Sequence, residues 1–130
     1  MTKTHFVIVV ADDDPAMNTL VCEVLADEGY EVHRCFTGAE AVGIMQRLYP
    51  DLAIVDMQME VRDAGLRVLQ ALRQHPATAH MAVIICSADD AFVRAKCHEI
   101  ASYGAEIISK PFDLAHLVAT VDRLLATPHP

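Results

Sequence analysis

The chain contains Phe6-Val7-Ile8-Val9-Val10-Ala11-Asp12-Asp13-Asp14-Pro15, an apolar run that ends abruptly at three adjacent carboxylates and a proline. Unpaired carboxylates repel one another and raise each other's pKa, so this concentration of negative charge indicates a bound cation. Oxygen ligands favour a hard ion such as Mg²⁺. The alternative is a helix cap at Asp14, with Pro15 at the first helical position and two solvated aspartates before it.

Composition limits the function classes. The 130 residues are 53% hydrophobic, which is typical of one globular domain with a real core. Acidic residues number 18 against 10 basic ones, and no basic cluster occurs, so we do not expect direct binding to nucleic acid. The four cysteines lack metal-finger spacing, and neither a secretory nor a membrane-length segment is present. We therefore expect a cytoplasmic protein that does not contact a membrane.

Two periods alternate along the chain. Apolar runs predict strands over 5–11, 31–36, 52–56, 82–86 and 106–109. Helical spacing and capping residues predict helices from Pro15 to just before Gly29, from the Thr37–Glu40 capping box through Leu48, from about Gly65 to Gln74, from about Asp90 to Tyr103, and from the cap Asp113 to Leu125. Apolar strands that alternate with helices favour an α/β fold, a doubly wound parallel sheet of five strands with helices on both faces.

Polar residues gather where these strands end. Asp12 and Asp13 follow the first strand, Asp56 ends the third, Ser87 follows the fourth and Lys110 follows the fifth. Ligands of open α/β sheets bind outside the carboxyl ends of the strands, so we expect these side chains to share one site. Any one of them alone is most simply a polar loop residue.

The chemistry that these residues permit is coherent. Asp13 and Asp56 are predicted to bind Mg²⁺ directly, and Asp12 to hold the waters of the ion. A carboxylate can also accept a phosphoryl group as a nucleophile, and Asp56 is the best candidate because it stands apart from the Asp triplet. Lys110 and the Ser87 hydroxyl would then counter charge on the transferred oxygens.

The chain resembles the receiver domains of two-component response regulators from about Phe6 to Leu125. The motifs that carry the resemblance are Val9-Val10-Ala11-Asp12-Asp13-Asp14-Pro15, Ile54-Val55-Asp56-Met57-Gln58-Met59, Ile84-Ile85-Cys86-Ser87-Ala88 and Ser109-Lys110-Pro111-Phe112. The resemblance implies a flavodoxin-like (βα)5 fold with strand order 2-1-3-4-5. It also implies one receiver domain over 5–126, followed by a disordered tail over 127–130.

The resemblance further implies a role for each residue of the site. Asp56 is the phosphoacceptor, Ser87 is the switch residue that bonds the phosphate, and Lys110 contacts the phosphate before a cis bond to Pro111. Mg²⁺ is the implied cofactor, and its ligands are Asp12, Asp13, Asp56 and the backbone carbonyl of Gln58.

Three departures from the family pattern concern the surroundings of the site. Glu60 stands where a proline is usual, which predicts a looser loop and a charge that opposes an incoming phosphoryl donor. The segment Asp63-Ala64-Gly65 carries one extra residue. Ile107 occupies the position at which Tyr or Phe usually switches, so the usual aromatic readout is missing.

The predicted function is phosphorelay signalling. A histidine kinase or phosphotransfer protein would phosphorylate Asp56, and the face formed by the fourth helix, fifth strand and fifth helix would act on an effector protein or a linked output domain outside this chain. We expect a monomer or weak homodimer that is not an enzyme. One alternative is a pseudo-receiver that works without phosphorylation, for which Glu60 and the altered loop argue. Another is a small phosphatase, for which Asp12 and Asp14 have the spacing but the chain has little room for a substrate cover.

Overall fold

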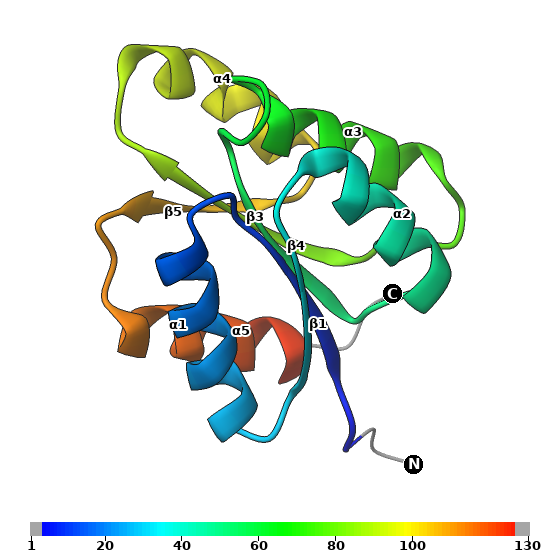
Figure 1. Ribbon diagram of the computed structural model, residues 1–130. Coiled ribbons are helices and arrows are strands. Elements are labelled where there is room, and N and C mark those ends of the chain that lie inside the picture. The colour runs from blue at the N-terminus through cyan, green and yellow to red at the C-terminus, as the bar shows by residue number, and fades with distance from the viewer. Residues whose placement is uncertain (1–3, 127–130) are drawn as a thin grey trace.

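Strands and helices alternate through residues 4–126, the part of the chain that the computed structural model describes (Figure 1). The strands are β1 (Val7–Ala11), β2 (Glu31–Cys35), β3 (Leu52–Asp56), β4 (Ala82–Ala88) and β5 (Glu106–Lys110). The helices are α1 (Pro15–Asp27), α2 (Gly38–Leu48), α3 (Ala64–Gln74), α4 (Ala91–Ser102) and α5 (Leu114–Ala126). The sequence predicted each of these elements. The predicted tail over 127–130 lies outside the described residues.

The five strands form one parallel sheet in the order β2-β1-β3-β4-β5. Helices α1 and α5 cover one face, and α2, α3 and α4 cover the other (Figure 1). The predicted doubly wound sheet and its 2-1-3-4-5 order are confirmed. Because β1 and β3 are neighbours although α1, β2 and α2 separate them in sequence, their carboxyl ends meet at the centre of one edge.

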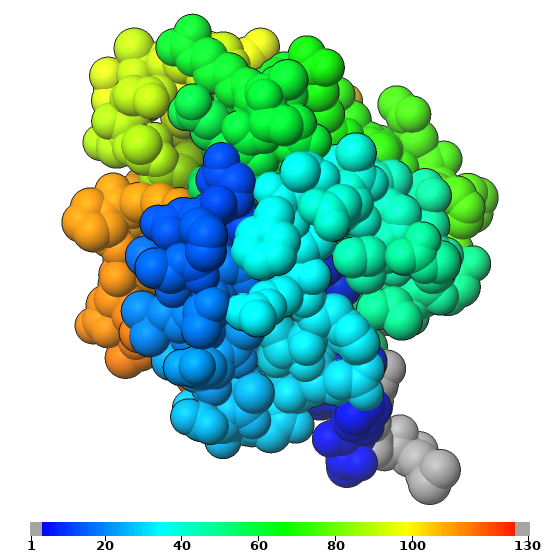
Figure 2. Space-filling view, in the orientation of Figure 1, coloured from blue at the N-terminus to red at the C-terminus, as the bar shows by residue number. Residues whose placement is uncertain are grey.

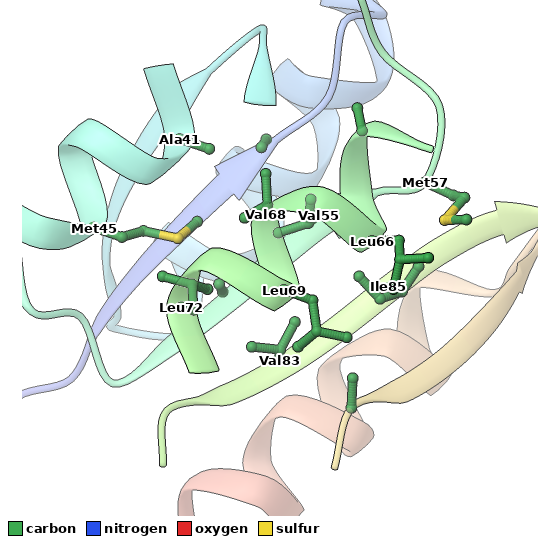
Figure 3. Packing of buried hydrophobic residues seen from close by; sticks show 14 of the residues in the cluster. Ala41, Met45, Val55, Met57, Leu66, Val68, Leu69, Leu72, Val83 and Ile85 are labelled. Atoms are coloured by element: carbon green, nitrogen blue, oxygen red, sulfur yellow. The ribbon is translucent and has the colours of Figure 1, made fainter. Parts of the chain in front are cut away.

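Each face of the sheet has its own hydrophobic core, because successive strand side chains point to opposite faces. On one face Val55, Val83 and Ile85 pack against Leu69 of α3 and Met45 of α2 (Figure 3). On the other face the buried set comprises Ile8, Val10, Ile54, Ile84, Val21, Leu25, Leu117 and Val121. Two such cores hold the central strands rigidly, so the ends of these strands are fixed platforms for side chains.

Two strands run further than the sequence predicted. The β4–β5 ladder continues through the pairs Ser87↔Ser109 and Ala88↔Lys110. Ser87 and Lys110 therefore lie within the last rungs of the sheet and do not follow it as loop residues. Parallel pairing with a neighbour supplies the backbone partners that extend both strands, and this pairing is not visible in either segment alone.

None of the helices within residues 4–126 has the length and apolar character that crossing a membrane requires.

Candidate functional site

Three carboxylates from two strands meet at the central edge of the sheet. Asp12 and Asp13 directly follow β1, and Asp56 is the last residue of β3. One carboxylate oxygen from each lies within 4.8 Å of the others. Asp12 and Asp56 are buried, whereas Asp13 is exposed. The structure therefore brings together the three acids that the sequence assigned to a metal.

The third aspartate of the triplet has a different role. The Asp14 carboxylate accepts hydrogen bonds from the backbone N–H groups of Ala16 and Met17 at 3.0 and 3.5 Å, and so caps α1. The two readings of the triplet thus apply to different residues. Asp14 is the helix cap, while Asp12 and Asp13 belong to the cluster.

A buried asparagine holds the β1–α1 loop in place. The Asn18 side-chain amide is fully buried and donates to the backbone carbonyls of Asp12 and Cys35, each at 2.9 Å. The backbone N–H of Asp14 in turn donates to the Asp12 carboxylate at 2.9 Å. These bonds fix the backbone of the acidic loop relative to β2 before any ligand binds.

Lys110 is the basic partner of the cluster. Its Nζ lies 3.0 Å from an Asp56 carboxylate oxygen and 3.5 Å from an Asp12 oxygen. Burial works against the charge of the ammonium, but the hydrogen bond to Asp56 and the two carboxylates outweigh it and raise the pKa of Lys110. The Lys110–Pro111 peptide bond is cis, as the resemblance implied.

Asp56 has an unusual protonation equilibrium. Burial raises the pKa of this carboxyl to about 6 from an ordinary 3.8; Lys110 acts against that shift, and Asp12 and Asp13 add to it. Burial is therefore the main cause of the raised pKa, and the attraction of Lys110 offsets only part of it. A carboxylate with this pKa is mainly ionised at neutral pH, as a nucleophile must be.

Ser87 lines the same cavity as Asp56, and its side chain makes no hydrogen bond within residues 4–126. The residue is 2% exposed, and its Oγ has no hydrogen-bond partner among the residues that the structure describes. A buried hydroxyl without a partner costs roughly 1–3 kcal/mol. An acceptor oxygen placed above Asp56 would remove that cost, which makes Ser87 a natural ligand for an anion at this position.

A cavity of about 310 Å³ opens over these residues. In Figure 2 the blue, green, yellow-green and orange segments that form it meet at the upper left of the molecule. Its lining residues are Asp13, Asp14, Asp56, Met57, Gln58, Met59, Arg62, Ser87, Ala88, Asp90, Phe92, Val93 and Lys110. The predicted ligand Gln58 thus borders the cavity, although the role of its backbone carbonyl stays a prediction.

The β3–α3 loop is held closely despite its unusual sequence. The Gly65 N–H donates to the Met57 carbonyl at 2.8 Å. A Cβ at Gly65 would lie 2.7 Å from the Asp56 carbonyl oxygen and 2.8 Å from the Met57 Cα, so only glycine fits there without a backbone shift. This close approach sets the position of the backbone that carries Asp56.

Glu60 faces α2, away from the cavity. Its carboxylate accepts hydrogen bonds from the backbone N–H groups of Gly38 and Ala39 at 2.8 and 3.1 Å. Desolvation works against its charge, but these N–H groups lower the pKa of Glu60. Two expectations from the sequence are therefore wrong in this structure: Glu60 adds no charge to the cavity lining, and it ties the loop to α2, so the loop is not loosened there.

Sequence reasoning missed three residues around the site. Arg62 and Phe92 line the cavity, and the Arg62 Cζ lies 4.0 Å from the centre of the Phe92 ring. No sequence signal distinguishes Arg62 from an ordinary loop arginine. Asn18 was detectable in principle, because it is a polar residue one turn after the helix cap and is spaced with the buried positions of α1.

The donor set of the cluster fits Mg²⁺. Three carboxylates present oxygen ligands to one point, and neither sulfur nor imidazole takes part. Of these three acids, Lys110 contacts only Asp12 and Asp56, so a divalent cation would further reduce the repulsion among them. One of the three carboxylates, Asp56, also contacts a lysine and lines a cavity with an unpaired hydroxyl, an arrangement that suits acceptance of a phosphoryl group.

Comparison with known proteins identifies one family. The family described as the response regulator receiver domain matches residues 8–122. The chain is 32% identical over 118 residues to a DNA-binding dual master transcriptional regulator, RpaA, of Synechocystis, covering 91% of this chain and 48% of the relative. It is 34% identical to the DNA-binding transcriptional regulator NtrC of Bradyrhizobium, covering 93% of this chain and 24% of the relative. The chain thus spans half or less of the length of these curated relatives.

Solved structures are similar over nearly the whole chain. The chemotaxis response regulator CheY4 of Vibrio cholerae superposes with a TM-score of 0.83 at 26% identity, covering 93% of this chain and 99% of that one. The receiver domain of the Francisella response regulator 1452 superposes with a TM-score of 0.81 at 26% identity, covering 93% and 97%.

Proposed function

The chain belongs to the family of response regulator receiver domains, whose role is two-component signalling, and from this premise we propose that it accepts a phosphoryl group on Asp56. The observation that carries the proposal is the geometry at one sheet edge. A buried carboxylate, a lysine 3.0 Å from it and an unpaired buried hydroxyl line the same cavity as a cluster of acids. A histidine kinase or phosphotransfer protein in the cytoplasm would be the donor.

In the proposed step an Asp56 carboxylate oxygen attacks the phosphorus of the donor in line with the leaving group. A P–O bond forms on Asp56 while the P–N bond of a phosphohistidine breaks, and its electron pair returns to the imidazole, which is then protonated. Lys110 leaves its carboxylate partners to contact a phosphoryl oxygen, and the Ser87 hydroxyl donates to another. Asp56 is consumed as an acceptor, so we propose no turnover of an external substrate.

Asp12, Asp13, Asp56 and the Gln58 carbonyl would hold Mg²⁺. When bound, this ion neutralises carboxylate charge and the charge that develops on the phosphoryl oxygens. Asn18 keeps the Asp12 backbone in place, and the close contact of Gly65 with β3 keeps the Asp56 backbone in place. The proposed roles of the site residues rest on this arrangement.

The proposed output is a change at the α4-β5-α5 face. A bond from Ser87 to the new phosphate would pull the end of β4, which leads within three residues to Asp90, the cap of α4. The relatives named above are DNA-binding regulators, so a linked output domain or a separate effector is the proposed receiver of the signal. Ile107 packs against the core on the α4 side and offers no aromatic ring for this change.

The test is the intact mass of the protein after incubation with Mg²⁺ and acetyl phosphate, beside Asp56→Asn. We expect a gain of one phosphoryl group that requires Mg²⁺ and does not occur in the variant. A gain that persists in Asp56→Asn would reject Asp56 as the acceptor. If neither acetyl phosphate nor a phosphorylated histidine kinase labels the wild-type protein, the result would favour the pseudo-receiver alternative, and a partner pull-down would be the next experiment.

A further inference from the structure

The cavity contains two cations whose side chains are differently engaged. Lys110 is bound to Asp56 at 3.0 Å and to Asp12 at 3.5 Å, so its charge is already shared between two carboxylates. Arg62, from the β3–α3 loop, has no hydrogen bond or ion pair among the described residues 4–126. Arg62 therefore provides the unpaired cation of the cavity lining.

The Phe92 ring holds the Arg62 guanidinium. The Cζ of Arg62 lies 4.0 Å from the ring centroid, which is within the range of a cation–π contact. Phe92 is in the first turn of α4 and packs against the hydrophobic core, so the ring is a firm support. A planar guanidinium stacked on a ring keeps its in-plane N–H donors available.

The charge of the cavity makes a free arginine significant. Asp13, Asp14, Asp56 and Asp90 line it, and a doubly negative donor must enter past these carboxylates. A guanidinium is suited to an incoming phosphoryl group because it donates two parallel hydrogen bonds to phosphate oxygens. Lys110 can contact a phosphoryl oxygen only after it leaves Asp56.

We propose that Arg62, supported by Phe92, binds the phosphoryl oxygens of the incoming donor and selects donors that carry a doubly charged phosphoryl group. The proposal rests on the proposed function and adds to it a residue that contacts the donor. It gives the extra loop length between Asp56 and Gly65 a use, because Arg62 lies within that loop.

The test compares two small donors at saturating Mg²⁺ near neutral pH. Acetyl phosphate is a dianion there, and phosphoramidate has a lower net negative charge. We expect Arg62→Gln to lower the apparent second-order rate constant with acetyl phosphate about tenfold, as for loss of one charged hydrogen bond at the lower end of its usual range, and to change the rate constant with phosphoramidate less than twofold. Arg62→Lys keeps the positive charge but cannot donate two parallel hydrogen bonds. Its rate constant with acetyl phosphate should lie between those of Arg62→Gln and the wild type.

Arg67→Gln is the matched control. Arg67 lies five residues further along, pairs with Asp63 at 2.9 Å and does not line the cavity. Arg67→Gln should leave the rate constants with acetyl phosphate and with phosphoramidate unchanged. Phe92→Leu should reproduce part of the Arg62→Gln effect, and the double variant should add little to Arg62→Gln alone.

The outcomes separate this proposal from the proposed function. Equal rates for Arg62→Gln and wild type, or equal losses with both donors, would overturn the role of Arg62 while leaving Asp56 as the acceptor. A parallel rise in the Mg²⁺ dissociation constant of Arg62→Gln, followed by thermal shift, would overturn it as well, because a structural defect would explain the loss. Absence of labelling in the wild type by both small donors and by a phosphorylated histidine kinase would count against the proposed function itself. Binding of beryllofluoride with Mg²⁺, a phosphoryl mimic that needs no transfer, would then test Arg62 by itself: equal affinity of wild type and Arg62→Gln overturns its role.

Discussion

Asp56→Asn should make the metal-free protein more stable near neutral pH. In the folded protein the pKa of Asp56 is about 6, against an ordinary 3.8. Folding therefore favours the protonated carboxyl, and the associated stability is complete below about pH 4 and lost as the pH rises through about 6. The difference between these two pKa values corresponds to about 3 kcal/mol. At neutral pH, ionisation of Asp56 lowers the free energy of unfolding by that amount.

The substitution replaces the carboxylate by a neutral amide, which should recover part of that difference. Asn keeps an oxygen that accepts from Lys110, and the pKa of about 6 already includes the attraction of Lys110 for the ionised carboxylate. The net expectation is a gain of about 1–2 kcal/mol in the free energy of unfolding, or roughly 4–8 °C in Tm for a chain of this size. At about pH 4 the gain should disappear, because the wild-type carboxyl is then protonated as well.

The assay is urea unfolding in the presence of a chelator at both pH values. Asp89→Asn makes the same change in charge at an exposed carboxylate that pairs with Arg94, and it should alter stability by less than about 0.5 kcal/mol. Saturating Mg²⁺ should reduce or reverse the order of the two proteins, since an ion at about 100 times its dissociation constant adds ~2.7 kcal/mol to the wild type. A variant that is less stable than the wild type in chelator, or a gain that is the same at both pH values, would refute the reasoning.

Three further substitutions probe the surroundings of Asp56. Ser87→Ala should leave the unmodified protein as stable as the wild type or up to about 1 kcal/mol more stable, because it removes an unpaired buried hydroxyl. A large loss of stability would contradict that account. The same variant should bind beryllofluoride more weakly, as measured by thermal shift. Gly65→Ala should lower the free energy of unfolding in urea by about 1–3 kcal/mol. The cost of overpacking against the Asp56 carbonyl should exceed the ~1 kcal/mol by which Ala favours a helix over Gly. An unchanged free energy of unfolding would show that the backbone shifts easily. Glu60→Gln should lower the free energy of unfolding by about 0.3–1 kcal/mol, because a neutral amide binds the N–H groups at the start of α2 more weakly. The rate of phosphoryl uptake should not change. Faster uptake would show that the charge of Glu60 repels the donor.

The fold was predictable because its determinants are local. Asp14 followed by Pro15 marks the start of α1, and the left-handed backbone at Gly29 and Gly104 marks the ends of α1 and α4. The acids of the site were predictable for the same reason, since each follows or ends an apolar strand. Which strand neighbours which was not derivable from these signals and came from the family resemblance.

What the sequence could not show depends on contacts between distant segments. The ends of β4 and β5 were misplaced because Ser87 and Lys110 are held by pairing with each other's strand. Glu60 was misread because its partners, the N–H groups that begin α2, are more than 20 residues away in the chain. A side chain's charge is visible in the sequence, but the direction in which it points is not.

The two kinds of unsatisfied group in the cavity together specify what the site binds. Three carboxylates meet at one point and Lys110 pairs with two of them, so the cluster favours a cation. The Ser87 hydroxyl and the Arg62 guanidinium are donors without acceptors, which requires an anion with several oxygens. A metal alone would leave the donors unused, and an anion alone would meet the repulsion of the acids. A divalent cation together with a phosphoryl group satisfies both, so binding of either one should tighten binding of the other.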